Sequence, residues 1–250
     1  MSGHSKWSQI KRQKGAADVK RGQAFTKLGR EITVAAREGG PDPDGNPRLR
    51  HAIARAREAS MPTDTIERAI KRASGGADAA ALEEIVYEGY GPGGAAILVE
   101  SLTDNRNRAV AEIRSAFTRA GGSLGESGCV AWLFEQRGVI AVDPAGADAD
   151  ELGLAAIDAG AEDVRVEDGT VEVLTRPADL DAVRSALEAQ GVRVLSAESA
   201  LVPKTTVPLD ERNAASTLRL MERLDDLDDV QRVYTNLEIS EEALRAYESR

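Results

Sequence analysis

Eight lysine and arginine side chains occur among the first thirty residues, against a single acidic residue, Asp18. Such cations neutralise phosphate groups and release the counterions that condense on nucleic acids. Aromatic rings beside them can stack on bases, and this segment contains Trp7 and Phe25. We therefore interpret the segment as a nucleic-acid-binding arm. Its candidate contact residues are Lys6, Trp7, Lys11, Arg12, Lys14, Lys20, Arg21, Lys27 and Arg30.

Other interpretations of this basic segment stay open. A run of charge is usually a solvated surface, and Trp7 with Ile10 also has the i, i+3 spacing of a packing pair on a helix. An arginine-rich start is typical of mitochondrial transit peptides as well, although Asp18 interrupts this one and the basic character continues past residue 30.

The distribution of charge along the chain favours the nucleic-acid interpretation. Residues 1–75 hold 16 basic and 8 acidic residues, a net charge of +8, whereas residues 76–250 hold 16 basic and 34 acidic residues, a net charge of −18. A body with that charge repels polyanions. The sequence therefore predicts that nucleic acid binds at the basic end of the chain.

A second polar cluster, Thr103–Arg108, lies where a helix is predicted to begin. Thr103 or Asp104 there is suited to cap the helix by accepting backbone N–H groups. Arg106 and Arg108, within one turn of the same helix start, are also placed to bind a phosphate. We add these two arginines to the candidate nucleic-acid contacts.

Gly89, Gly91 and Gly94 have the G-x-G-x-x-G spacing of dinucleotide-binding loops. That motif requires a helix to open after the last glycine, so that backbone N–H groups face the pyrophosphate. Here the apolar stretch AAILVESL follows and predicts a strand. We interpret the glycines as a hairpin turn.

The residues needed for catalysis and metal binding are scarce. Cys129 is the single cysteine, and His4 and His51 are the two histidines. No Cys/His set has zinc-ligand spacing, and no nucleophile–base pattern, phosphate loop or paired acid–base carboxylates stand out. We expect a non-enzymatic protein with no catalytic residue, metal, cofactor or small-molecule substrate, and with Cys129 as a buried apolar side chain.

The chain has no apolar run of bilayer length and no hydrophobic core of a secretory signal. We therefore expect no membrane partner and a cytoplasmic location. With 42% hydrophobic and 30% charged residues, the composition is that of a globular protein.

The elements that position the basic residues are predicted to be helical. In residues 23–39, Phe25, Leu28, Ile32 and Ala35 form one apolar stripe at helical spacing. Gly39, Gly40 and Pro41 end this helix, and further helices are predicted over 46–61 and 63–76.

Residues 77–250 alternate between strands and helices. Two strands joined by a turn are predicted over 83–102, followed by a helix over 103–122 and a strand over 129–135. Residues 136–199 then have the pattern of strand, helix, two strands, helix and strand, which is the ferredoxin-like order. Residues 200–238 supply a strand, a helix and a strand.

These elements predict an α+β fold of three domains. Residues 1–76 form a basic N-terminal helical domain. Residues 77–135 contain too few elements for a complete two-helix sandwich, so we expect residues 200–238 to complete this α/β domain. Residues 136–199 then form a second ferredoxin-like α/β domain inserted in the first.

Five stretches in order along the chain resemble the YebC family, which includes the mitochondrial translational activator of cytochrome c oxidase. They are GHSKW at 3–7, KRQKGAADVKRGQAFTKLGREI at 11–32, MPTDTIERAIKRASG at 61–75, YEGYGPGG at 87–94 and LTDNRNR at 102–108. The resemblance runs through nearly the whole chain. It implies a cytoplasmic, non-enzymatic protein of three domains without a cofactor, and it places the family's basic segment on Lys6, Lys11, Arg12, Lys14, Lys20 and Arg21.

The resemblance implies a nucleic-acid-binding regulator of gene expression, since members are described as DNA-binding transcriptional regulators. Other members are described as ribosome-associated translation factors that relieve stalling at proline runs, so an RNA-binding protein that contacts rRNA or tRNA is the alternative. The predicted turns between the helices are long and rich in proline and glycine, which argues against a helix-turn-helix. A protein-interaction scaffold built on the two sheets is a third hypothesis.

Overall fold

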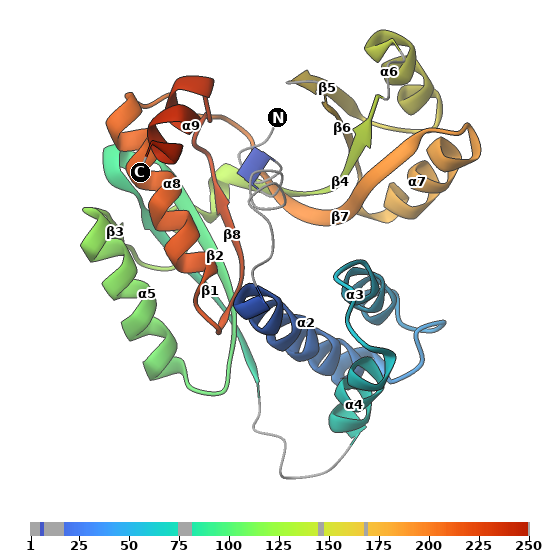
Figure 1. The fold of residues 1–250 in the computed structure, drawn as a ribbon, viewed down its shortest axis with the longest axis horizontal. Coiled ribbons are helices and arrows are strands. Elements are labelled where there is room, and N and C mark those ends of the chain that lie inside the picture. Colours follow the sequence, from blue (N-terminus) through green and yellow to red (C-terminus); the bar gives the residue numbers. More distant parts are fainter. Residues whose placement is uncertain (1–5, 8–17, 75–81, 145–147, 168–169, 250) are drawn as a thin grey trace. The chain divides into compact units, whose positions relative to one another are not determined.

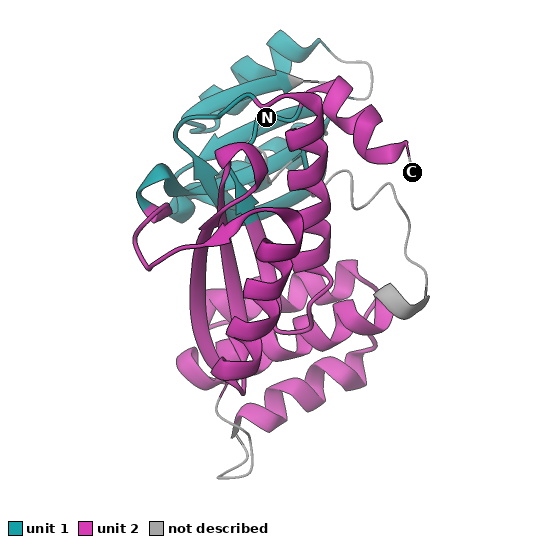
Figure 2. Cartoon of the chain, turned by 90° about the vertical axis from the view of Figure 1, so that its left-hand side faces the viewer, with its two compact units in different colours: residues 1–11, 132–208, 234–239 teal, residues 12–131, 209–233, 240–250 magenta. Residues whose placement is uncertain are grey.

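The computed structural model describes residues 6–7, 18–74, 82–144, 148–167 and 170–249 (Figure 1). The chain divides into two compact units, shown in teal and magenta in Figure 2. Unit 1 comprises residues 1–11, 132–208 and 234–239, and unit 2 comprises residues 12–131, 209–233 and 240–250.

Three helices open the described part of unit 2: α2 (Asp18–Gly39), α3 (Pro47–Glu58) and α4 (Thr63–Ser74). The apolar stripe predicted for the first helix is confirmed, because Leu28, Ile32 and Ala35 are buried. α2 ends where Gly40 takes a φ of +90°, a conformation that favours glycine. Residues from all three helices share one hydrophobic core, made of Leu28, Ile32, Ala35, Ala36, Leu49, Ala52, Ile53, Ala56, Met61, Ile66 and Ala69.

A four-stranded sheet follows, with the strand order β3-β1-β2-β8. Its strands are β1 (Glu83–Tyr90), β2 (Ala96–Thr103), β3 (Ser123–Leu124) and β8 (Val230–Thr235). The helices α5 (Arg106–Ala120) and α8 (Glu211–Asp225) pack against each other beside this sheet, and α9 (Glu241–Glu248) packs on α8 (Figure 1). β8 therefore brings the C-terminal part of the chain into the sheet that β1 and β2 begin.

The glycine-rich segment is a hairpin turn, as predicted. β1 and β2 pair antiparallel on either side of the 3-10 helix Pro92–Gly94, so no helix opens after Gly94. Gly89 lies in the strand for a packing reason: a Cβ atom there would lie 2.5 Å from the backbone oxygen of Ser123 and 2.8 Å from the ring of Phe117. Glycine at this position therefore allows close packing of β1 on its neighbours.

The second sheet belongs to unit 1 and has the strand order β5-β6-β4-β7. In chain order its elements are β4 (Phe134–Asp143), α6 (Ala149–Asp158), β5 (Asp163–Glu167), β6 (Thr170–Thr175), α7 (Leu180–Ala189) and β7 (Arg193–Pro203). All three strand pairs are antiparallel. The predicted ferredoxin-like order of two helices on one antiparallel sheet is confirmed.

The strand predicted over residues 129–135 is wrong for most of its length. Residues 131–133 form a 3-10 helix, and β4 begins only at Phe134 and continues to Asp143. The backbone N–H groups of Val130 and Ala131 donate to the carboxylate of Glu88 at 2.8 and 2.7 Å. A loop held by a side chain in this way does not pair in a sheet, although its residues are as apolar as those of a strand.

The α+β class, with an N-terminal helical region and two antiparallel sheets, is confirmed. The domain boundaries at residues 1–76, 77–135 with 200–238, and 136–199 stay a prediction. In the part of the chain that the structure describes, no helix combines the length and the hydropathy required to cross a membrane.

Candidate nucleic-acid interface

The predicted arm lies only partly within the described residues. Lys11, Arg12 and Lys14 lie outside them, and so does the side chain of Lys20, whose backbone belongs to α2. Arg21, in the first turns of α2, is exposed. These positions stay predicted contacts.

Lys6 and Trp7, near the start of the chain, are helical. The Lys6 side chain is half-buried, and Trp7 is only 2% exposed. A ring with so little accessible surface packs inside the protein and offers no face on which a base can stack. Of the two interpretations of Trp7, the structure supports packing.

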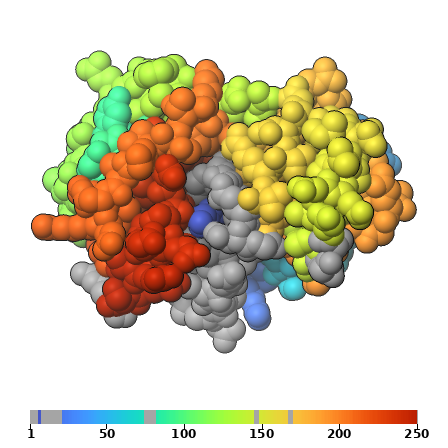
Figure 3. Space-filling view, turned by 90° about the horizontal axis from the view of Figure 1, so that it is seen from above, coloured from blue at the N-terminus to red at the C-terminus, as the bar shows by residue number. Residues whose placement is uncertain are grey.

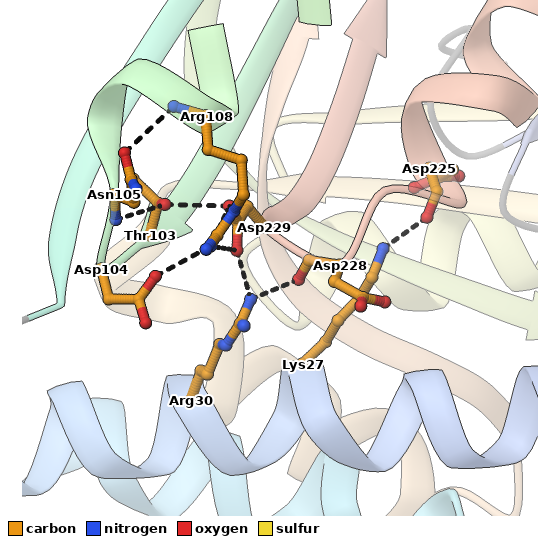
Figure 4. Close-up of polar contacts among 9 residues, drawn as sticks. All are labelled: Lys27, Arg30, Thr103, Asp104, Asn105, Arg108, Asp225, Asp228 and Asp229. Atoms are coloured by element: carbon orange, nitrogen blue, oxygen red, sulfur yellow. Dashed lines mark hydrogen bonds and ion pairs between the residues drawn. The ribbon is translucent and has the colours of Figure 1, made fainter. Parts of the chain in front are cut away.

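Lys27 and Arg30 lie on α2 and point toward the loop between α8 and β8 (Figure 4). The ammonium group of Lys27 donates to the backbone oxygen of Asp225. Arg30 donates to the backbone oxygen of Asp228 at 2.6 Å and to the carboxylate of Asp229 at 2.8 Å. Both cations therefore attach the first long helix to the α/β part of the same unit.

Arg108, on α5, meets the same carboxylate. Its guanidinium donates through Nη2 to both oxygens of Asp229, at 3.0 and 2.8 Å, and through Nε at 3.2 Å. A further bond at 2.8 Å reaches Asp104. Hydrogen bonds from Arg108 to Asp229, and then to Asp104, raise the pKa of this arginine further above its ordinary value.

Asp229 is the centre of this network, although its own side chain is only 3% exposed. Besides the two arginines, the hydroxyl of Thr103 donates to it at 2.9 Å, and its backbone oxygen accepts from Leu102 at 2.8 Å. We call Arg30, Thr103, Asp104, Arg108 and Asp229 the Asp229 network. The network gives Arg30 and Arg108 protein partners, and Asp225 gives one to Lys27, so the positions of all three cations are accounted for without a phosphate.

The start of α5 differs from the expected capping arrangement. Asn105, rather than Thr103 or Asp104, is the N-cap and accepts from the backbone N–H of Arg108 at 3.1 Å. Thr103 instead accepts from the backbone N–H of Asn105. Arg106 is exposed on this helix and stays a predicted phosphate contact.

The structure also shows exposed cations beyond those predicted as contacts. Helices α3 and α4 bury their apolar faces in the shared core, which leaves their charged faces outward. Arg48 and Arg55 on α3 form ion pairs with glutamates. The remaining exposed cations of the two helices are Arg50, Arg57, Arg68, Lys71 and Arg72. In the sequence, the i, i+3, i+4 spacing of Arg68, Lys71 and Arg72 indicates that these residues share one face of a helix.

The turn between α3 and α4 is short, in contrast to the long turns expected from the sequence. These helices are joined by only four residues, Ala59–Pro62, which is a turn length found in that motif. Ser60 takes a φ of +61° there, which closes the turn. The exposed side of the second helix carries the three cations Arg68, Lys71 and Arg72.

Glu88, on β1, is a buried carboxylate with a structural role. It is 4% exposed and accepts from the backbone N–H groups of Gly128, Val130 and Ala131 at 2.6, 2.8 and 2.7 Å. Burial alone would raise the pKa of Glu88, but these three donors together lower it. Cys129 lies in the same loop and is half-buried rather than buried. Burial, with the charge of Glu88, raises the pKa of its thiol.

Comparisons with known proteins give consistent matches over the whole chain. The family model described as TACO1/YebC protein N-terminal domain matches residues 5–76, and the one described as TACO1/YebC second and third domain matches residues 82–237. A relative from Desulfosudis oleivorans, named "Probable transcriptional regulatory protein", is 56% identical over 96% of this chain and 98% of its own. One from Dehalococcoides mccartyi, also called a probable transcriptional regulatory protein, is 55% identical over 100% and 99%.

A solved structure shows the same fold. It is the crystal structure of a conserved hypothetical protein, Aq1575, from Aquifex aeolicus. The two chains share 47% sequence identity and a TM-score of 0.81, over 90% of this chain and 93% of that one.

Proposed function

Because this chain belongs to the TACO1/YebC family, we propose that it is a non-enzymatic, cytoplasmic regulator of gene expression that binds DNA and acts on transcription. The names of its relatives support the regulatory part of this proposal. DNA binding is inferred from the charge of the chain and from the exposed cations of its helical region.

The segregation of charge is the observation that carries the proposal. A net charge of +8 lies within residues 1–75 and a net charge of −18 lies in the remainder. Phosphate contacts supply most of the affinity of non-specific nucleic-acid binding. The negative remainder opposes binding elsewhere on the chain and so directs a polyanion to the basic segment.

We divide the predicted contact residues into a primary group, a secondary group and a group with structural roles. The basic segment Lys11, Arg12, Lys14, Lys20 and Arg21 is the primary phosphate-binding region of the proposal. Arg106 and the exposed cations of α3 and α4 are secondary contacts. Arg30 and Arg108 bind Asp229, and Lys27 binds the backbone of Asp225; through Lys27 and Arg30 these contacts position the basic helix α2 on the unit that carries it.

The four-residue turn between α3 and α4 is compatible with a helix-turn-helix. In a helix-turn-helix the second helix enters the major groove and its side chains contact base edges. α4 would be that helix, and Arg68, Lys71 and Arg72 on its exposed side are suited to guanines or phosphates. The proposal therefore assigns sequence reading to α4 and sequence-independent affinity to the preceding segment.

The second candidate is a ribosome-associated translation factor whose basic segment contacts rRNA or tRNA. The specific observation behind it is that all five primary cations lie within eleven residues near the start of the chain, from Lys11 to Arg21. A short basic segment that reaches into folded RNA needs only phosphates.

One experiment in cells distinguishes these candidates. In a strain lacking this gene, the DNA-binding proposal predicts altered transcript levels for a limited set of genes, with ribosome occupancy that follows transcript level. RNA sequencing and ribosome profiling of the same cultures measure both. Ribosome pauses at proline runs without matching transcript changes would contradict transcription as the site of action and favour the second candidate. Complementation by the wild-type gene is the control.

A further inference from the structure

Helix α6 of unit 1 exposes two large apolar side chains that are not part of the hydrophobic core of the unit. Leu154 is 68% exposed and Ile157 is 48% exposed. They lie three residues apart, so they are neighbours on one side of the helix. The opposite side holds α6 on its sheet, where Ala156 is fully buried and Ala149 and Leu152 pack against the core.

Acidic side chains surround this apolar pair. Asp150 and Glu151 precede Leu154 by four and three residues, and Asp158 follows it by four, so all three adjoin Leu154 on the helix surface. All three are exposed. The lime and yellow residues in Figure 3, which include α6, show that this part of unit 1 lies at the surface.

Local helix stability explains only part of this arrangement. Asp150 and Glu151 lie in the first turn of α6, where negative charge interacts well with the helix dipole. Asp158 lies in the last turn, where the same interaction is unfavourable, and no basic residue lies there. Because Leu154 and Ile157 are exposed, they do not contribute the stabilising free energy that burial of their apolar surface would provide. Two exposed apolar side chains and a carboxylate in the last turn each lower the stability of the helix. Their occurrence at one place indicates a functional surface.

We propose that this face of α6, formed by Asp150, Glu151, Leu154, Ile157 and Asp158, docks a basic amphipathic segment of a partner protein. Apolar side chains of the partner cover Leu154 and Ile157, and its lysines or arginines meet the three carboxylates. The three carboxylates repel nucleic acids and anionic membranes, so a positively charged protein segment is the class of partner that fits this face. The inference goes beyond the proposed function and does not depend on it.

The proposal is tested by titrating the full-length protein with a helical peptide made only of leucine and lysine, with the leucines on one face. The same peptide with glutamate in place of lysine is the charge control. We expect the lysine peptide to bind and the glutamate peptide not to bind. The variant L154S/I157S should bind about tenfold more weakly or worse, equivalent to at least ~1.4 kcal/mol. The variant D150N/E151Q/D158N should bind more weakly and show little of the wild-type salt dependence.

A matched variant, V86S/L195S, removes two apolar side chains that are 49% and 41% exposed elsewhere, and it should bind as the wild type does. Circular dichroism confirms that each variant is folded. Unchanged binding by L154S/I157S would overturn the proposal, because it would show a purely Coulombic attraction to the acidic body. Equal weakening in V86S/L195S, or no binding by the wild type, would overturn it as well. Sedimentation that shows a wild-type dimer abolished by L154S/I157S would identify a second copy as the occupant and would also overturn it.

Discussion

Replacing Asp229 with alanine should lower the free energy of unfolding by about 2 to 3 kcal/mol. Breaking a fully buried ion pair by removal of one partner costs roughly 3 to 5 kcal/mol. The effect here should be smaller, because the side chains of Arg30 and Arg108 are 21% and 43% exposed and reach water. Asp229 itself is almost fully buried, and its removal takes away the acceptor for two arginines and a threonine.

Urea denaturation measures this change as a shift in the midpoint at constant slope. The matched control is Asp228→Ala, because Asp228 is exposed and contributes only its backbone oxygen to Arg30. That variant should change stability by less than about 0.5 kcal/mol. Equal effects of the two substitutions would show that the carboxylate of Asp229 does not attach α2.

Replacing Glu88 with glutamine should lower the free energy of unfolding by about 1.5 to 3 kcal/mol at pH 7, the range for hydrogen bonds to a charged group. The carboxylate accepts three backbone N–H groups. A glutamine side chain keeps one carbonyl oxygen and turns an NH₂ group toward donors, so part of the set is left without an acceptor. Glu83→Gln is the control, since Glu83 is exposed on the same strand.

The stability difference between wild type and Glu88→Gln should depend on pH. The pKa of Glu88 is lower in the folded state than the ordinary glutamate value of 4.5. Its contribution is therefore fully present above that value and disappears as the pH falls through the folded-state pKa. Urea titrations between pH 7 and pH 3 should show the two proteins converging at the acidic end. A constant difference across this range would contradict the role of Glu88 as a charged acceptor.

Much of the fold follows from patterns that are local in the sequence. The stripe Leu28, Ile32 and Ala35 predicts the buried face of α2, and the strand–helix order of residues 136–199 predicts the ferredoxin-like sheet. Residues 129–133 are apolar, and for that reason the same kind of pattern predicts a strand there. Their actual conformation depends on Glu88, about forty residues earlier, and no local pattern indicates that contact.

In the candidate interface, too, the partners of charged residues cannot be predicted from the local sequence. Lys27, Arg30 and Arg108 have the residue types that phosphate binding needs, and their spacing gives no reason to exclude them. What assigns Arg30 and Arg108 to the protein itself is Asp229, which lies about two hundred residues from Arg30 and reaches it only through the fold. The charge of a segment can be predicted from the sequence, but the partner of each cation depends on contacts between distant parts of the chain.

The most direct test of the central claim is the salt dependence of nucleic-acid binding by a variant with Lys11, Arg12, Lys14, Lys20 and Arg21 replaced by alanine. The matched control replaces with alanine five arginines of the acidic remainder whose side chains are 37% to 73% exposed, namely Arg165, Arg176, Arg184, Arg193 and Arg245. Each variant removes five positive charges, so a difference between them reports position rather than net charge.

Fluorescence anisotropy with labelled duplex DNA and with structured RNA, at several salt concentrations, gives the slope of log K against log salt. We predict that the slope of the first variant becomes shallower by about 0.7 to 0.9 for each phosphate that is no longer neutralised, with weaker binding at every salt concentration, while the control variant keeps the wild-type slope. A first variant with the affinity and slope of the wild type, or a control that is weakened as much, would contradict the claim that the basic start of the chain binds nucleic acid.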